Sequence, residues 1–476
     1  MLDKKVSELF RAKEENTERL AKEEKHELRG EFDRDRDRIL YSRAFRRLSG
    51  KTQVFLSGED DHIRNRLSHT LEVAQIARTI SKALGLNEIL TEAIALGHDM
   101  GHTPFGHVGE RTLNDIMSGC DALRTEYKNC LSDEQKGFKH NWQSIRVVKD
   151  LESCNNTNQG LNLTKYTLWG MLNHSSLTYK KCKFYNDSNS KCTFRGSFEE
   201  CRNINKTSSL KFYDKYNEIL KNENITIEGL IVALSDEIAQ RHHDVEDALV
   251  ANIIEFEDLK NKIKECYGDF FREDKGDNKR FTEIDHEKNN NTKRIMLSSF
   301  IVNLLTREVI YSLEKILEGY QDLYDIYSSE DFEKKKLNDD FINHLKSDID
   351  FNKHLKEKDK GFQHFIWNRI LHSHKAQLMD GKGKFVIREI FKAYITNPQQ
   401  LPDKTIERLF ENLKEEGIHT KRNNENVGDL RDELDDLHSK NKNTYKAVLM
   451  RTICDYISGM TDNYALSLHS QLYVSK

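Results

Sequence analysis

Apolar residues recur every three or four positions through most of this chain, and long alternating apolar–polar runs are missing. That spacing places apolar side chains on one face of an α-helix, whereas strict alternation is typical of a half-buried strand. The 476 residues also include only three prolines, so few positions interrupt a helix. The sequence therefore predicts an all-α protein.

The composition limits the kind of protein this chain can be. Hydrophobic residues make up 37% of it and charged residues 32%, and the mean hydropathy is −0.77. No stretch approaches the roughly 20 consecutive apolar residues of a membrane-spanning helix. The N-terminal MLDKKVSELFRAKEEN lacks the apolar core of a signal peptide. We therefore expect a cytoplasmic protein with no membrane partner.

The charge and the cysteines identify no partner by themselves. A formal net charge of −4 leaves any affinity for phosphate or nucleic acid to local groups. The eight cysteines form no Cys-x-x-Cys pair, which does not fit a secreted disulfide framework. Cys182, Cys192 and Cys201, with Cys154, leave a structural zinc site open, but their irregular spacing favours reduced thiols.

The helical pattern divides the chain into three regions. A charged helical lead-in covers residues 1–38, a core covers 39–255, and a helical C-terminal region at 256–476 packs on that core. The Lys-, Asn-, Ser- and Cys-rich stretch at about 178–210 is interpreted as an inserted loop region. Two further polar stretches are expected to lack helix, 273–294 and 415–443. The clearest helical patterns cover residues 66–84, 87–99, 141–150, 161–174, 225–254 and 444–471.

Four residues stand out as candidate metal ligands: His69, His98, Asp99 and Asp236. His69 falls on the apolar stripe of its helix, which for a histidine taken alone is more often a core position than a ligand position. Asp236 lies in LIVALSDEIA, a segment apolar enough to be buried, and a buried carboxylate is costly without a cation. A mixed imidazole and carboxylate set suits one divalent ion such as Mn²⁺, Fe²⁺ or Zn²⁺, whereas Mg²⁺ prefers oxygen ligands.

The segment HDMGHTPFGHVGE adds a candidate acid–base pair. His107 and Glu110 are three residues apart and share a face if the segment is helical. A carboxylate beside an imidazole fixes its tautomer and raises its basicity, as acid–base catalysis requires. Thr103 and Pro104 are typical of the N-cap and first position of a helix.

Other polar residues near these positions are candidates for binding a phosphorylated substrate. His102 and His140 are candidates for a phosphate-binding wall. Steps of about 100° per residue place Gln240 and His243 near the face of Asp236, with Asp244 slightly round from it. We expect these side chains to face the same cavity and to contact a sugar or base, and we interpret His242 as part of a polar helix flank.

Six motifs of this sequence resemble those of one known family. Three of them resemble the HD-domain deoxynucleoside triphosphate triphosphohydrolases, often called dGTPases: NRLSHTLEVAQIARTI, ALGHDMGHTPFGHVGE and ALSDEIAQRHHDVEDAL. SRAFRRLSGKTQVF, LNLTKYTLWGML and DYISGMTDNYA are similar to the same family, so the resemblance covers residues 26–175, 225–255 and part of the C-terminal helix. It implies an all-α HD core that converts a dNTP, dGTP or several, and water into a deoxynucleoside and inorganic triphosphate.

The resemblance also implies roles for particular residues. His69, His98, Asp99 and Asp236 match the ligands of one divalent ion, which would be Mn²⁺, Mg²⁺, Fe²⁺ or Co²⁺. The remaining positions match a catalytic pair (His107, Glu110), phosphate contacts (Arg66, His102, His140) and contacts to the deoxyribose 3′-hydroxyl (Gln53, Asp244). Gln240 departs from many relatives, which carry a tyrosine in the sugar pocket at that position.

The family resemblance further implies a homo-oligomer, commonly a hexamer, with a dNTP at a second, allosteric site. Two other readings stay open. One is a different HD phosphohydrolase, such as a nucleotidase or a guanosine polyphosphate hydrolase. The other is a dNTP-sensing or nucleic-acid-binding scaffold, for which the Lys-rich segments 255–265 and 333–360 would offer weak contacts to single-stranded nucleic acid, although acidic residues interrupt both.

Overall fold

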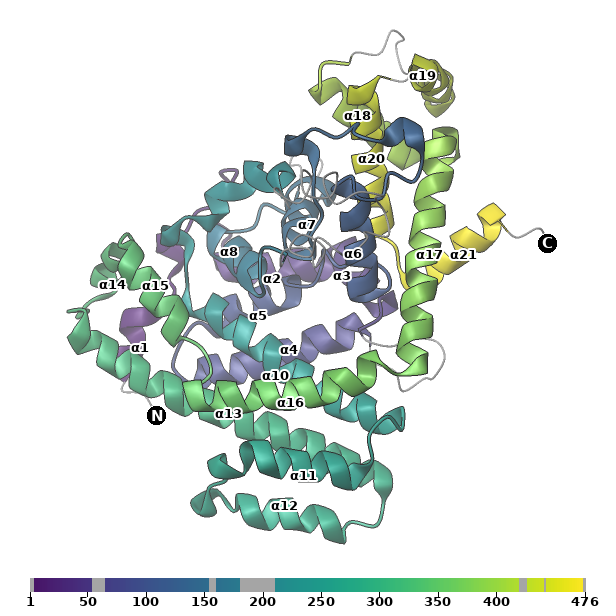
Figure 1. The fold of residues 1–476 in the computed structure, drawn as a ribbon. Helices are drawn as coiled ribbons and strands as arrows, with labels where there is room; N and C mark the ends of the chain where they lie inside the picture. Colours follow the sequence, from purple (N-terminus) through teal and green to yellow (C-terminus); the bar gives the residue numbers. More distant parts are fainter. Residues whose placement is uncertain are drawn as a thin grey trace, which may run out of the picture.

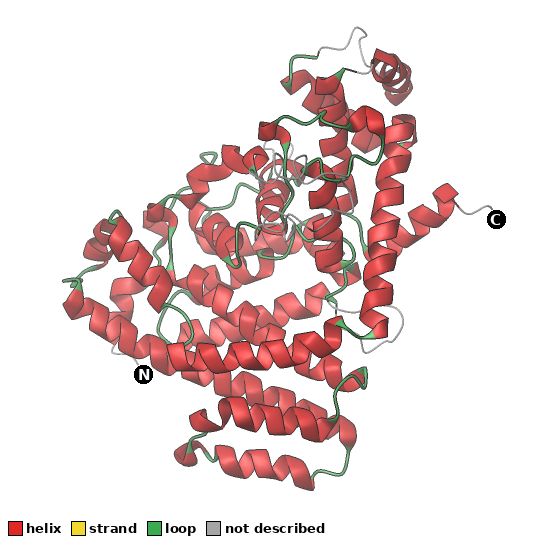
Figure 2. Ribbon diagram, in the orientation of Figure 1, coloured by secondary structure: helices red, strands yellow, loops and turns green. Residues whose placement is uncertain are grey.

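The computed structural model describes residues 4–53, 65–153, 160–179, 210–418, 426–440 and 442–473. Within these ranges the chain forms helices, turns and three isolated β-bridges, and no strand (Figure 2). The prediction of an all-α fold is confirmed. Almost all of the stretch at 178–210, and with it Cys182, Cys192 and Cys201, lies outside the described residues, as does Cys154.

The centre of the molecule is a group of helices that pack on one another (Figure 1). Their apolar faces meet in a large buried cluster that includes Val73, Ile94 and Ile231. The helices predicted at 66–84, 87–99 and 225–254 are all present with nearly those bounds, because each carries a continuous apolar stripe. The group comprises α2 (Glu31–Tyr41), α4 (Arg66–Ala83), α5 (Glu88–Gly97), α8 (Lys165–Asn173) and α10 (Ile227–Val250).

The N-terminal lead-in is less helical than predicted. Only α1 (Lys4–Phe10) and α2 are α-helices, and between them the chain has a short 3-10 turn at Glu14–Asn16 and otherwise no helix. Arg19 lies in this segment and is paired with Glu31 and Asp35 of α2, at 2.5 and 2.6 Å. The ion pairs of Arg19 therefore fasten an extended segment of the lead-in to α2. Helical periodicity along the sequence does not reveal this attachment.

The long helix α13 (Asn290–Leu323) packs against α10 in the central cluster. Among the described residues it is the one helix long and apolar enough to cross a membrane, with a mean hydropathy of 1.2 over an 18-residue window of which 39% is buried. As expected, α13 contains no uninterrupted run of about 20 apolar residues. Its mean hydropathy is nevertheless as high as that of a candidate membrane-spanning helix. Leu304, Leu305 and Val309 are buried inside the protein, as in a core helix.

The regions predicted as polar breaks contain helices. Residues 273–294 include α12 (Asp277–His286) and the start of α13, and residues 415–443 include α19 (Val427–Lys440). Each helix has few apolar residues but buries them, as Phe281 and Ile284 do in α12. Tertiary packing of two or three side chains outweighs the polar composition there.

The other helices flank this centre, and the C-terminal ones form a second buried cluster with α6 (Gly106–Met117). Helices α11 and α12 lie at one end of the molecule, whereas α18 and α19 lie at the other (Figure 1). Eight further α-helices are α3 (Arg43–Arg47), α7 (His140–Arg146), α11 (Phe256–Tyr267), α14 (Ser329–Lys335), α15 (Asp339–Asp348), α16 (Lys353–Leu371), α17 (His374–Thr396) and α18 (Asp403–Glu415).

The single helix predicted at 444–471 is two helices, α20 (Asn443–Ser458) and α21 (Asp462–Tyr473). The break lets the fully buried Asp462 reach across to two other segments. Its carboxylate accepts hydrogen bonds from the backbone N–H of Thr52 and of Phe105, each at 2.9 Å. Asp462 therefore ties the C-terminal helices to the segments that precede α4 and α6.

Replacing Asp462 with alanine is expected to lower the free energy of unfolding by about 2–4 kcal/mol, because two buried N–H groups lose their acceptor. Urea denaturation measures the change. Asp403→Ala is the matched control, since that carboxylate is 66% exposed and pairs with Arg431 at the surface; its effect should stay within about 0.5 kcal/mol. Equal stability of the two variants would contradict this role for Asp462.

Candidate active site

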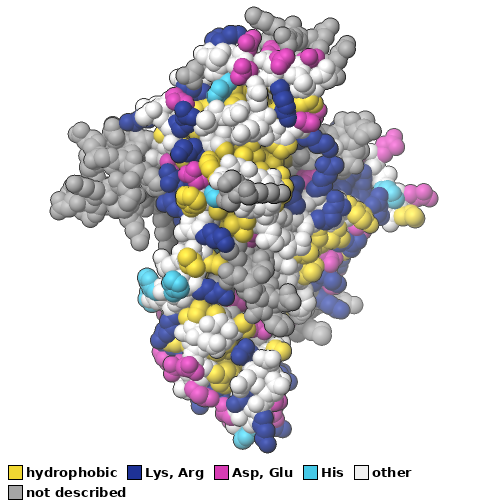
Figure 3. Space-filling view, turned by 90° about the vertical axis from the view of Figure 1, so that its right-hand side faces the viewer, with side chains coloured by type: hydrophobic (Ala, Val, Ile, Leu, Met, Phe, Trp, Pro, Cys, Tyr) yellow, Lys and Arg dark blue, Asp and Glu magenta, His cyan; other side chains and the backbone are white. Residues whose placement is uncertain are grey.

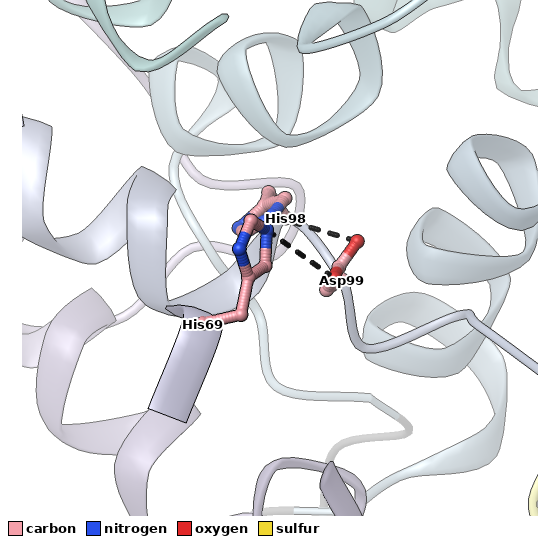
Figure 4. Close-up of side chains that lie close together, drawn as sticks. All are labelled: His69, His98 and Asp99. Atoms are coloured by element: carbon pink, nitrogen blue, oxygen red, sulfur yellow. Dashed lines mark ion pairs between the residues drawn. The ribbon is translucent and has the colours of Figure 1, made fainter. Parts of the chain in front are cut away.

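The four predicted metal ligands come together from three parts of the chain. His69 lies near the start of α4, His98 and Asp99 directly follow α5, and Asp236 lies in the middle of α10. His69 Nε2 is 2.9 Å from Asp236 Oδ1 and 4.0 Å from Asp99 Oδ2. His98 Nε2 is 3.5 Å from Asp99 Oδ1 and 3.9 Å from Asp236 Oδ1. Figure 4 shows His69, His98 and Asp99 turned toward one another.

The hydrogen bonds of His98 show that this cluster fits a cation. Its Nδ1 lies 2.6 Å from the Ala95 carbonyl oxygen, so Nδ1 carries the proton and donates it. The Nε2 lone pair then faces two carboxylates and has no hydrogen-bond partner among the described residues. A lone pair and two anions repel one another unless a positive ion lies between them, and a backbone acceptor on the far nitrogen is the usual support of a metal-binding histidine.

Arg66 and His102 both contact the Asp99 carboxylate. Arg66 Nη1 donates to Asp99 Oδ2 at 2.7 Å, and His102 Nε2 lies 3.1 Å from Asp99 Oδ1. Burial alone would raise the pKa of Asp99, but His102, His98 and Arg66 hold it well below its usual range. The structure thus brings the predicted phosphate-contacting residues Arg66 and His102 to the edge of the cluster.

Glu110 is oriented toward a different histidine from the one expected. The sequence predicts that it supports His107, three residues earlier in α6. In the structure the Glu110 carboxylate is hydrogen-bonded to Nδ1 of His140, at the start of α7, while the exposed His107 ring makes no hydrogen bond to a described residue. Burial would raise the pKa of Glu110, but His140 and Lys139 hold it well below its usual range. A contact between two helices therefore replaces the pairing expected within one.

The start of α6 also differs from the expectation. The helix begins at Gly106, because Phe105 (φ 60°) and Gly106 (φ 57°) both adopt the left-handed conformation. Thr103 and Pro104 therefore lie in the preceding turn, where the Thr103 hydroxyl donates to the Gly106 carbonyl at 2.9 Å. This turn leaves His107 exposed in the first turn of the helix. Although its ring is exposed, the buried protein around it lowers the pKa of His107 to about 4, against the opposing effect of Glu110.

His174 is a site residue that the sequence reasoning missed. It directly follows α8, its Nδ1 lies 2.7 Å from the Met171 carbonyl oxygen, and its Nε2 is 3.3 Å from His140 Nε2. The His174 ring lies 5.0 Å from that of His98, and the His140 ring stacks on that of His102 at 3.9 Å. His98 and His174 share one signal, a histidine just after a buried helix, donating to the carbonyl three residues back.

A close helix contact and a buried lysine hold the segment from His98 to His107 in place. A side-chain carbon at Gly101 would lie 2.1 Å from the Ser144 backbone nitrogen, so only glycine lets α7 approach this loop. The buried Lys51 donates to the carbonyl oxygens of His102 and, at 2.8 Å, of Ser458. Burial lowers the pKa of Lys51 to about 7. The sequence reasoning missed this lysine, which looks exposed in SGKTQ but positions the loop.

Tyr179, beside Glu110, is a third residue that the sequence reasoning missed. Its hydroxyl lies 2.7 Å from Glu110 Oε1 and 2.9 Å from the Phe138 carbonyl oxygen. Burial and the charge of Glu110 raise its pKa well above its usual range, so the hydroxyl stays protonated and can donate. Tyr179 and His140 thus hold Glu110 through different oxygens.

Replacing Tyr179 with phenylalanine is expected to lower turnover by about 10-fold, the rate equivalent of one lost hydrogen bond of about 1–1.5 kcal/mol. Bound metal, measured by mass spectrometry of the metal, should not change. Tyr473→Phe is the control, because that exposed hydroxyl binds the Glu389 carbonyl away from the site. Unchanged turnover in Tyr179→Phe would show that Glu110 is oriented without it.

The predicted sugar-contacting residues form one hydrogen-bonded chain. Gln53 Nε2 donates to Gln240 Oε1 at 3.4 Å, and Gln240 Nε2 donates to Asp244 Oδ1 at 3.0 Å. Trp367 of α16, which is 45% exposed and was not anticipated, donates to Asp244 Oδ2 at 2.9 Å. Gln240 lies four residues after Asp236 on α10, so this series of hydrogen bonds passes about one helical turn from the metal cluster.

The two histidines of α10, His242 and His243, lie against α4. The His243 ring is 4.9 Å from the His69 ring, as expected for a residue on the face of Asp236. His242, interpreted as part of a polar flank, instead lies 2.7 Å from Glu72 through its Nδ1.

Comparison with known proteins places this site in a family. The HD domain matches residues 66–241, and the phosphohydrolase-associated domain matches residues 349–429 and 421–471. A protein of Caldanaerobacter subterraneus subsp. tengcongensis is 31% identical over 97% of this chain and 90% of its own length. One of Rickettsia felis is 32% identical over 95% of this chain and 94% of its own. Both are named deoxyguanosinetriphosphate triphosphohydrolase-like proteins, as is one of Leptospira interrogans at 30% identity. The chain therefore belongs to the deoxyguanosinetriphosphate triphosphohydrolase-like family of HD-domain phosphohydrolases.

Proposed function

We propose that the protein hydrolyses deoxynucleoside triphosphates, dGTP or several of them, to a deoxynucleoside and inorganic triphosphate. One observation carries this proposal: His98 Nε2 faces the carboxylates of Asp99 and Asp236, an arrangement that a bound divalent ion would stabilise, beside His102, His140 and His174. The relatives' names supply the substrate class. The chain of Gln53, Gln240 and Asp244 supports it, since it offers amide and carboxylate groups for a sugar hydroxyl.

The four converging ligands would hold one divalent ion, for which Mn²⁺, Fe²⁺ or Co²⁺ suits the mixed imidazole and carboxylate donors better than Mg²⁺. When bound, such an ion polarises a phosphate oxygen and lowers the pKa of a water molecule. His69 and Asp236 bring donors from α4 and α10, so the same packing that forms the core sets the geometry of the site.

The remaining residues would bind and orient the triphosphate. Arg66 keeps its guanidinium at the edge of the cluster through Asp99, where it can offset negative charge that develops on phosphoryl oxygens. His102 is held flat against His140, which fixes the direction of both rings. His107 is exposed, and with a pKa of about 4 its ring is neutral at pH 7, so it must take up a proton before it can donate one.

The Glu110–His140–His174 series would handle a proton. His174 donates through Nδ1 to Met171, so its Nε2 has only a lone pair to offer at the 3.3 Å contact with His140. A hydrogen bond there requires a proton on His140 Nε2 in addition to the one that Nδ1 shares with Glu110. His140 would then be an imidazolium stabilised by Glu110, able to donate to the departing 5′-oxygen. His107 and His140 are thus the two candidates for that step.

Gln240 is expected to weaken the selection of deoxyribose over ribose. Gln240→Tyr would place a ring beside Asp244 and should lower kcat/KM for GTP relative to dGTP by about 10-fold, the effect of a steric contact in a sugar pocket. Competition between the two nucleotides measures the ratio. An unchanged ratio would place the sugar elsewhere.

Incubation with each dNTP and NTP in turn, with Mn²⁺, Mg²⁺ or Co²⁺, tests the proposed reaction. We expect inorganic triphosphate and a deoxynucleoside in equal amounts, fastest with one or several dNTPs. Release of orthophosphate or pyrophosphate would instead identify another kind of HD phosphohydrolase.

Assembly and regulation are proposed from the family resemblance alone. We expect a cytoplasmic homo-oligomer, with a hexamer as the first candidate, and a regulatory dNTP site; light scattering with and without dNTP tests both. Single-stranded nucleic acid is a weaker partner, because acidic residues interrupt the Lys-rich segments 255–265 and 333–360. The face in Figure 3 carries both basic and acidic side chains. Any such binding should fall steeply as salt is raised.

A further inference from the structure

A second group of metal-binding side chains lies next to the first. Glu72 of α4 follows His69 by three residues, and His243 of α10 follows Asp236 by seven, so each lies on the same helix face as a predicted ligand. The packing of α4 on α10 therefore brings Glu72 to His242 and His243, as it brings His69 to Asp236. The His69 and His243 rings, 4.9 Å apart, form the wall between the two groups.

The donor atoms of this second group converge on one point. Glu72 Oε2 is 2.7 Å from His242 Nδ1 and 2.8 Å from His243 Nε2, and the three atoms lie within 4.8 Å of one another. Ligands about 2.0–2.2 Å from one ion are separated from each other by about 3 Å. The first group shows comparable spacing, with His69 Nε2 2.9 Å from Asp236 Oδ1.

The chemistry and accessibility of the group also suit an ion. Two imidazoles and a carboxylate are typical ligands of Mn²⁺, Fe²⁺, Co²⁺ or Zn²⁺, with positions left for water. His243 is fully buried, whereas the side chains of His242 and Glu72 are 18% and 29% exposed, so an ion can enter from solvent. Glu246 Oε2 lies 3.6 Å from His242 Nε2, so its negative charge also favours a cation here.

We propose that Glu72, His242 and His243 hold a second divalent transition-metal ion beside the cluster of His69, His98, Asp99 and Asp236. An ion there fastens α4 to α10 and fixes the His243 ring against His69. The proposal concerns metal binding and does not depend on which nucleotide the enzyme hydrolyses.

Metal counting on the full-length protein tests this site. The protein is stripped with a chelator, reloaded with Mn²⁺, freed of excess ion by gel filtration and analysed by mass spectrometry of the metal. We expect two equivalents per chain in the wild type and one in His242→Asn or Glu72→Gln. His286→Asn, at an exposed position on α12, is the matched control and should keep two. One equivalent in the wild type, or two in His242→Asn, would overturn the proposal.

A second measurement separates this site from the first. In Asp236→Ala, which removes a ligand of the first cluster only, Mn²⁺ should still raise the melting temperature, because an ion that binds only the folded state stabilises it. Adding His242→Asn should abolish that rise. If Asp236→Ala folds and shows no response to Mn²⁺, the second site does not exist, whatever the activity of the wild type.

Discussion

Replacing Asp236 with alanine is expected to remove one equivalent of metal and to abolish hydrolysis together. Asp236 Oδ1 lies within 4 Å of both His69 Nε2 and His98 Nε2, so its loss leaves two imidazoles without the carboxylate that brings them to one ion. Turnover should fall by about 10³-fold or more, equivalent to ~4 kcal/mol of transition-state stabilisation.

Metal content and initial rate are measured on the same preparation of Asp236→Ala. Asp322→Ala is the control, because that carboxylate is exposed on α13 and should keep both properties. A variant that keeps its rate after losing the metal would show that catalysis does not use this cluster. One that keeps both would show that Asp236 is not a ligand.

Replacing Glu110 with glutamine is expected to lower turnover by about 10²–10⁴-fold, the usual contribution of a positioned acid–base group, without changing metal content. Glu110 is bonded to His140 rather than to a metal ligand, and glutamine loses the negative charge that stabilises the His140 imidazolium. Initial rates at saturating substrate and metal analysis of the same sample measure the two effects.

A double-mutant cycle identifies the histidine that works with Glu110. If the pair is Glu110 and His140, Glu110→Gln and His140→Gln should each cost nearly as much as the double variant, because the two act as one unit. His107→Ala should reduce turnover separately and leave the metal in place. Full activity in His107→Ala would remove His107 from the mechanism, and additive effects of Glu110→Gln and His140→Gln would rule out their pairing.

The helices of the core could be predicted because each carries its own apolar stripe. α4, α5 and α10 bury their apolar faces, and the same spacing places His69 in the interior and Asp236, which is 23% exposed, beside it. The ligand set followed from two local signals, a carboxylate in an apolar helix and a histidine–aspartate pair at a helix end. Each signal lies within one short stretch of the sequence, so no contact with a distant segment is needed to detect it.

The features that could not be predicted depend on contacts between distant segments. Glu110 is held by His140 and Tyr179, 30 and 69 residues away, and helix periodicity suggested His107 instead. The break between α20 and α21 is explained by Asp462 reaching Thr52, 410 residues away. Polar segments such as α12 became helical only through packing on α13. No regular residue spacing along the sequence predicts these contacts.

Hydrolysis of dGTP in H₂¹⁸O, with Mn²⁺ present and the products separated for mass spectrometry, tests the central claim most directly. Attack of water on the α-phosphorus with departure of the 5′-oxygen places one ¹⁸O atom in inorganic triphosphate and none in deoxyguanosine. The proposed reaction predicts that labelled triphosphate forms in an amount equal to deoxyguanosine, and that the Asp236→Ala protein forms neither. Labelled orthophosphate or pyrophosphate, or ¹⁸O in the deoxynucleoside, would contradict it.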